Sequence, residues 1–172
     1  MTDRPLFLEI FERAIVTHFS RCTGLEGRWS IARQDRQCEF SLAARSSDGF
    51  DVGARCETYG LYPYAGDWHG APWEPVGGSI EQLCDSYCGF VRALVSPDAR
   101  LRLMYRRQHL AASAIELRTA DGWRVFEKHR EGVLPLGKTR EVVLQNQHLP
   151  SRFPFTGLQL DDWNMYPWLG GA

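Results

Sequence analysis

The sequence predicts a two-layer α+β domain, in which two main helices pack on a mostly antiparallel sheet of about six strands. Segments 5–21 and 79–95 repeat apolar residues every three or four positions, as amphipathic helices do. Several shorter segments alternate apolar and polar residues, as half-buried strands do. Short polar turns separate many of these strands, and such turns are typical of antiparallel hairpins.

The first half of the chain is predicted to hold a helix followed by an antiparallel meander. Asp3 can cap helix 5–21, Pro5 suits its first turn, and Gly24 can end it. Polar turns at 34–36 and 46–49 then separate three alternating segments. The predicted strands are 28–33, 37–45 and 50–60.

Residues 61–78 are interpreted as a loop, because Gly and Pro interrupt the segment between its aromatic residues. Ser79 and Gln82 have the spacing of a capping box, which predicts the start of helix 79–95, and Pro97 stops this helix. Strands are then predicted at 100–107, 110–118 and 122–129, and 141–145 also looks regular. Arginines of the 100–107 strand are expected on a solvated face, and Trp29 and Trp123 are expected to fill the core.

Composition limits the domain organisation and the classes of partner. Residues 1–130 are expected to form a single α+β domain, with 131–172 as a C-terminal extension that packs on it. The net charge of −1 argues against nucleic-acid binding. The start of the chain lacks the features of a signal peptide, and no apolar run is long enough to cross a bilayer, so we expect a cytoplasmic protein without a membrane partner.

The chain offers two weak candidates for chemistry. Cys84 and Cys88 are four residues apart on a helix, but a zinc site needs two further ligands, so we interpret them as buried thiols. His69 could be a general base oriented by Asp67, or the segment could be a packed loop with Trp68 in the core. There is no phosphate-binding loop and no nucleophile elbow. We therefore expect no catalytic residue, no metal and no cofactor.

Two segments rich in aromatic residues, 57–75 and 153–168, predict a protein-binding surface. Trp and Tyr beside carboxylates are typical anchors of protein interfaces, and exposed rings are costly unless a partner covers them. The expected partner-binding residues are Glu57, Tyr59, Tyr62, Tyr64, Asp67, Trp68, His69, Trp73, Glu74, Asp161, Asp162, Trp163, Tyr166 and Trp168.

The order of these segments resembles the small immunity proteins of bacterial polymorphic toxin systems, which accompany contact-dependent and type VI-delivered toxins. The matching pieces are Gly66-Asp67-Trp68-His69, the capped helix at 79–95, Arg100-Leu101-Arg102-Leu103 and Asp121-Gly122-Trp123-Arg124-Val125. The resemblance covers about residues 5–128. It implies a protein that binds a cognate toxin and occludes its active site, and it implies no catalytic residue.

Two other functions stay open at this point. The chain could be an adaptor or chaperone-like module for a secreted effector, or a small enzyme that uses His69. The sequence does not determine the oligomeric state or the activity of the toxin.

Overall fold

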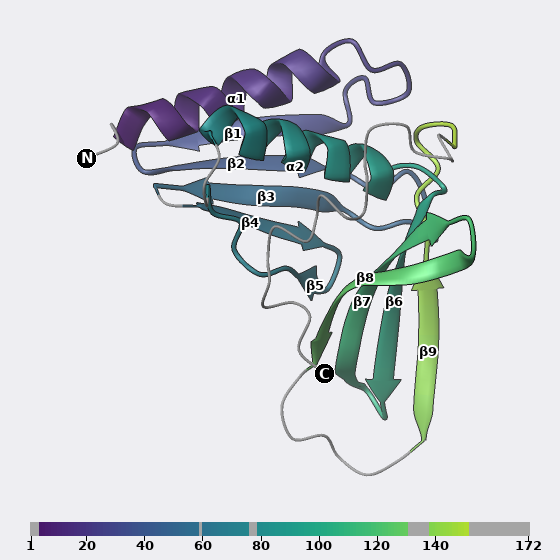
Figure 1. The fold of residues 1–172 in the computed structure, drawn as a ribbon. Helices are drawn as coiled ribbons and strands as arrows, with labels where there is room; N and C mark the ends of the chain where they lie inside the picture. Colours follow the sequence, from purple (N-terminus) through teal and green to yellow (C-terminus); the bar gives the residue numbers. More distant parts are fainter. Residues whose placement is uncertain (1–3, 59, 76–78, 131–137, 152–172) are drawn as a thin grey trace.

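The computed structural model describes residues 4–58, 60–75, 79–130 and 138–151, and its fold is α+β (Figure 1). In chain order the elements are α1 (Arg4–Phe19), β1 (Trp29–Gln34), β2 (Gln37–Leu42), β3 (Val52–Glu57), β4 (Gly60–Ala65), β5 (Trp68–His69), α2 (Ile80–Leu94), β6 (Ala99–Arg106), β7 (His109–Thr119), β8 (Gly122–Arg130) and β9 (Thr139–Leu144). Neither described helix has the length and apolar character that crossing a membrane requires.

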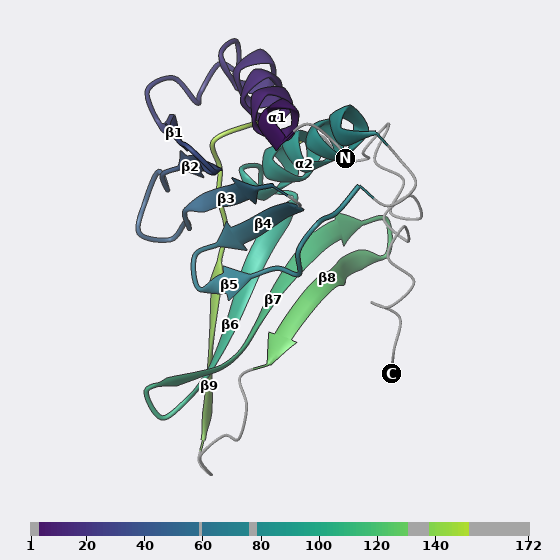
Figure 2. The ribbon, with the colours of Figure 1, turned by 90° about the vertical axis from the view of Figure 1, so that its left-hand side faces the viewer.

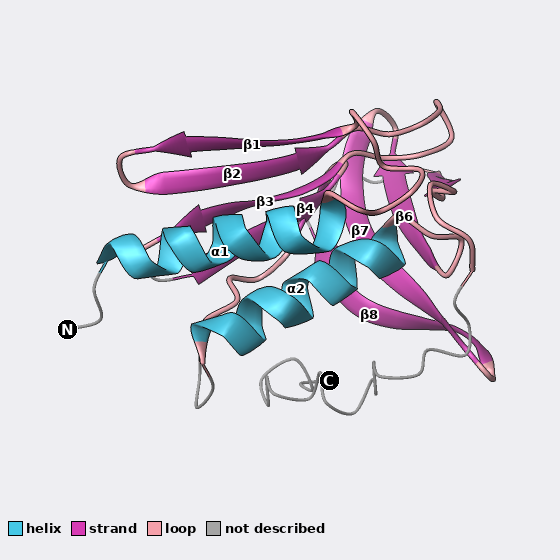
Figure 3. Cartoon of the chain, turned by 90° about the horizontal axis from the view of Figure 1, so that it is seen from above, coloured by secondary structure: helices cyan, strands magenta, loops and turns pink. Residues whose placement is uncertain are grey.

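Strands β1 to β5 form the first sheet, an antiparallel meander in chain order, and both helices lie against one face of it (Figure 3). Side chains on this sheet alternate between the helices and the opposite side. On β2, for example, Phe40 and Leu42 are fully buried, whereas Glu39 is exposed. Phe19 of α1 stacks on Phe40 with ring centroids 5.3 Å apart, and Tyr87 of α2 meets Phe40 edge-on at 6.4 Å. The helices and the sheet thus share one aromatic core.

Helix α2 begins as its sequence predicts. Ser79 Oγ accepts a hydrogen bond from the Gln82 backbone N–H at 3.2 Å, and Gln82 Oε1 accepts one from the Ser79 N–H at 3.1 Å. This reciprocal capping box satisfies two donors that a helix otherwise leaves unpaired. The predicted helices 5–21 and 79–95 are confirmed within one or two residues at each end.

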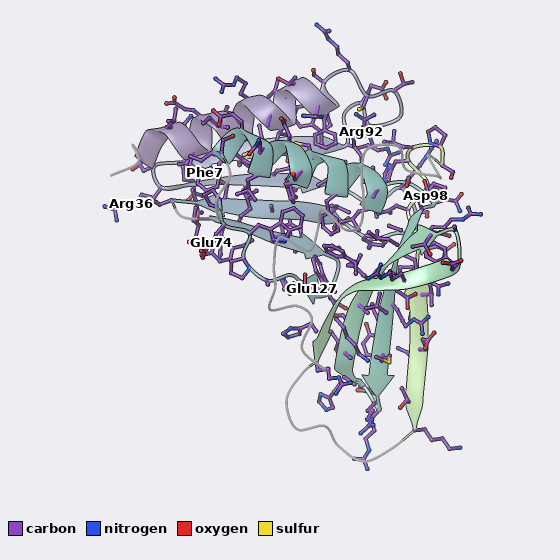
Figure 4. The ribbon with its side chains drawn as sticks, in the orientation of Figure 1. Phe7, Arg36, Glu74, Arg92, Asp98 and Glu127 are labelled. Carbon is purple, nitrogen blue, oxygen red and sulfur yellow. The ribbon has the colours of Figure 1, made fainter. Side chains whose placement is uncertain are left out.

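The second sheet has the strand order β8-β7-β6-β9 and is also antiparallel. Its strands run beside β5 and away from the helices (Figure 2). Phe90 of α2 lies 6.2 Å from Trp68 of β5 and 5.1 Å from Phe126 of β8, measured between ring centroids. Glu127, labelled in Figure 4, accepts a hydrogen bond from the Ala71 N–H at 2.9 Å. The two sheets therefore pack around a common core.

The predicted α+β class with two helices is confirmed, but the expected number of strands, about six in one sheet, is too low. The described residues form nine strands in two sheets. The segment 61–78 was expected to be a loop, yet it contains most of β4 and all of β5.

Pro63 is one of the residues that predict a loop here, and the structure shows how β4 tolerates it. Leu61 and Trp73 exchange backbone hydrogen bonds of 2.9 and 2.8 Å, so Leu61 turns its peptide groups away from β3. By strand alternation Pro63 does the same, and its missing N–H removes no hydrogen bond to β3.

Residues 139–151, which the sequence assigns to the C-terminal extension, contribute to the fold directly. Strand β9 pairs with β6 along its whole length. Beyond it, the Asn146 side chain accepts a hydrogen bond from Phe50 N–H at 3.2 Å and donates to the carbonyls of Phe50 and Leu94. The backbone N–H groups of His148 and Leu149 donate to the carbonyl of Val95, which lies just after α2. This segment ties the end of α2 to both sheets.

His148 gives the fold a predicted pH dependence. Its side chain is 5% exposed, and its ring nitrogens have no hydrogen-bond partner among the described residues. Burial lowers the pKa of His148 below its usual value of 6.5, and the positive charges of Arg28 and Arg45 lower it further. The unfolded chain therefore binds a proton more readily. Stability is retained above the unfolded pKa and lost as the pH falls below it, toward the folded pKa.

We expect His148→Gln to reduce the loss of stability between about pH 8 and about pH 5. The measurement is the free energy of unfolding in urea at both pH values. His18→Gln is the matched control, because His18 is part-exposed and faces Asp85 at 3.1 Å. The same pH dependence in His148→Gln as in the wild type would rule out this role for His148.

Candidate protein-binding surface

The aromatic residues expected to bind a partner separate into buried and solvent-facing groups. Trp68 is fully buried and Trp73 is 5% exposed. Trp68 is opposite Ala65 at an inward position of the sheet, and Trp73 packs on Phe90 at 5.3 Å and on Tyr87 at 6.0 Å. The structure therefore corrects the expectation for these two residues: they are core residues, and the packed alternative for Trp68 is the one observed.

Other expected partner-binding residues fall outside the described residues. They are Tyr59, Asp161, Asp162, Trp163, Tyr166 and Trp168.

The remaining aromatic candidates come together on the face of the first sheet that is turned away from the helices, which we call the outer face. Directly paired residues of antiparallel strands place their side chains on the same face. Tyr62 of β4 pairs with Arg55 of β3, and Tyr64 of β4 pairs with His69 of β5. Glu57 lies two residues beyond Arg55 on the same side. The outer face thus combines four of the predicted residues with one arginine that sequence reasoning did not single out.

Arg55 holds the acidic and aromatic parts of the outer face together. Its Nε lies 2.8 Å from Glu57 Oε1, and its guanidinium carbon lies 5.5 Å from the centre of the Tyr62 ring. An arginine over a ring is attracted by the negative face of the ring. These contacts restrict both side chains, so a partner would meet a surface that is already partly ordered.

Tyr64 is seated over Gly53, its neighbour on β3. A Cβ at position 53 would overlap the Tyr64 hydroxyl and the Phe40 carbonyl, so only glycine fits there. The ring also contacts the His69 imidazole, with centroids 6.5 Å apart. Burial raises the pKa of the Tyr64 hydroxyl, and the nearby carboxylates Glu39 and Asp51 raise it further. Tyr64 therefore presents a neutral, half-buried ring and hydroxyl.

The hypothesis of an Asp67–His69 pair has little support in the geometry. Asp67 Oδ2 accepts a hydrogen bond from the Tyr105 hydroxyl at 3.2 Å, which directs it toward the second sheet. His69 lies instead beside Tyr64 on the outer face. Glu74 is exposed at the end of the segment that follows β5.

All five cysteines are free thiols, and Cys84 and Cys88 are fully buried in the core, as their interpretation as apolar-face residues predicts. Burial raises the pKa of the Cys84 thiol to about 12 and that of Cys38 to about 11, so these groups stay protonated near neutral pH. Across the described ranges, no three His, Cys, Asp or Glu side chains are grouped to hold a metal ion.

Sequence reasoning missed a second surface, on the four-stranded sheet. Trp123 was expected in the core, but it is 37% exposed, whereas Trp29 does pack against the core. Trp123 pairs with Arg118 and shares its side of the sheet with Arg100. The sequence did contain a signal for this surface, namely the arginines of 100–107 that are predicted to face outward. Strands that pair with 100–107 must also place half of their side chains on that outward side.

Comparisons of the chain with protein-family models, with curated proteins and with solved structures found no match.

Proposed function

We propose that this protein is an immunity protein that binds a cognate bacterial toxin and neutralises it by covering the active site of the toxin. The observation that carries the proposal is the outer face, where Tyr62, Tyr64 and His69 lie beside Arg55 and Glu57 on three adjacent strands. The resemblance of the element order to immunity proteins supports the same function.

Tyr62 and Tyr64 are suited to anchor a bound partner. Tyrosines are common anchor residues of protein interfaces because each ring offers a large contact area and a hydroxyl. Here both tyrosines stand on strands within a sheet rather than on a free loop. Tyr62 is held by Arg55, and Tyr64 is held over Gly53. Little side-chain freedom is then lost on binding, which favours the tight complex that neutralising a toxin requires.

The charge of the outer face indicates the kind of toxin surface that fits. Glu57 is paired with Arg55, whereas Glu39, on the same face, is exposed and carries a further negative charge. A mildly acidic face with aromatic anchors suits a basic patch on the toxin, and charge complementarity of this kind speeds association and selects partners.

The proposal predicts a toxin gene next to the gene of this protein, and the test is the affinity of single variants for the product of that gene. We expect Tyr62→Ala and Tyr64→Ala each to cost about 2 kcal/mol or more, hence a loss of roughly thirtyfold in affinity. Val16→Ala is the matched control, since Val16 is 43% exposed on α1, on the helical side of the sheet. Unfolding in urea separates lost binding from lost folding.

Two results would contradict the proposal. If wild-type protein does not bind this toxin, the proposed function is wrong. If it binds and both tyrosine variants bind equally well while folded, the toxin uses another surface.

A further inference from the structure

The side of the second sheet that is turned away from the core is strongly basic. Alternation along the paired strands places six cationic side chains on this side, with Glu116 and Glu141 as the acidic ones. The resulting net charge is +4, although the whole chain carries −1. We call this surface the basic face. Its cations are Arg100, Arg102, Arg106, Arg118, Lys128 and Arg130.

The basic face also carries apolar side chains in contact with solvent. Trp123 is 37%, Val125 is 49% and Val143 is 45% exposed, and these are three of the five exposed large hydrophobic residues among the described ranges. Trp123 and Val125 lie on edge strand β8, and Val143 lies on edge strand β9. Apolar residues thus flank the central arginines on both sides. Grouping of this kind on one face is typical of an interaction surface.

A buried carboxylate fixes two of the arginines. The Glu116 side chain is 5% exposed, and its oxygens lie 2.5 Å from Arg100 Nε and 3.0 Å from Arg102 Nη2. Arg102 also reaches Glu141 at 3.6 Å. The guanidinium carbon of Arg100 lies 4.3 Å from the centre of the Trp123 ring. This part of the surface is therefore ordered before any partner arrives, which lowers the entropy lost on binding.

We propose that the basic face binds an acidic segment of another protein, in which carboxylates alternate with apolar side chains. Lys128, Arg130 and Arg106 supply cations outside the Glu116 cluster, and Trp123, Val125 and Val143 supply the apolar contacts. This site goes beyond toxin binding and does not depend on it, because it lies on a different sheet from the outer face.

Nucleic acid is the less suitable ligand. Base stacking needs an open ring face, and Arg100 already occupies one face of Trp123. The exposed valines gain nothing from a phosphate backbone, whereas they would be covered by a protein segment.

The experiment is selection of a random peptide display library on the full chain, with depletion on the variant Lys128→Glu/Arg130→Glu. We expect the enriched peptides to contain Asp or Glu interspersed with apolar residues. Their affinity, measured by fluorescence anisotropy, should fall with salt and weaken about tenfold or more in Trp123→Ala and in the double variant. Arg36→Glu is the matched charge control, because Arg36 is exposed in the β1–β2 turn, away from the second sheet (Figure 4).

Three outcomes would overturn the proposal: enriched peptides without acidic residues, equal weakening by Arg36→Glu, or tighter binding of a labelled single-stranded DNA that is lost in the same basic-face variants. Tyr62→Ala should leave the selected peptides bound. Failure of toxin binding alone would therefore leave this inference standing, and failure of peptide binding alone would leave the toxin proposal standing.

Discussion

Replacing Trp68 with alanine should lower the free energy of unfolding by about 3–5 kcal/mol, the range for removing a large aromatic side chain from a core. Trp68 is fully buried, and its ring packs on Phe90 of α2 and against Gly70. Because it stands where the two sheets meet, the cavity left behind would touch both. The measurement is equilibrium unfolding in urea, followed by circular dichroism.

Trp123→Ala is the control for this prediction, since it removes the same side chain from a surface. Trp123 is 37% exposed, and its ring makes a cation–π interaction with Arg100. We expect a loss of at most about 1 kcal/mol. Equal losses in the two variants would contradict the assignment of Trp68 to the core and of Trp123 to the surface.

The helices could be predicted almost completely from the sequence, because their signals are local. The capping box at Ser79 and Gln82 and the apolar repeat of α2 lie within one segment, and the observed helix ends one residue before its predicted end. Strands β6 to β8 were also predicted within one residue at each end, since their alternation is regular and their turns are short.

The aromatic residues of 61–78 could not be assigned from composition, because inward and outward positions depend on the register between strands. Tyr64 and Trp68 are four residues apart and equally aromatic. Tyr64 pairs with His69 on the outer side, and Trp68 pairs with Ala65 on the inner side. The turn at Gly66, whose φ is +53°, sets this register. The number of aromatic residues in this segment therefore does not distinguish surface residues from core residues.

The strand pairing of the second sheet also could not be predicted from the sequence, because it depends on segments that are far apart in the chain. Strand β9 joins β6 across a separation of about thirty residues in the chain, and a bulge opposite Ile115 and Glu116 shifts the pairing of β8. The sequence predicts that arginines of β6 face outward, and this is confirmed for Arg100 and Arg102. It does not predict that one buried glutamate binds both.

The second large effect on stability is expected at Glu116. Replacing Arg100 and Arg102 together with alanine should destabilise the fold by about 3–5 kcal/mol, because it leaves the Glu116 carboxylate buried without a cation. Urea unfolding at neutral pH measures the loss.

A third substitution makes the test specific. Adding Glu116→Gln to the double variant removes the buried charge, so the triple variant should recover most of the lost stability. Glu141→Gln is the surface control. Glu141 is 48% exposed and lies 3.6 Å from Arg102, so its removal should cost at most about 1 kcal/mol. If the triple variant is no more stable than the double variant, the loss comes from the packing of the arginine side chains over Trp123 and the neighbouring strands, not from the charge of Glu116.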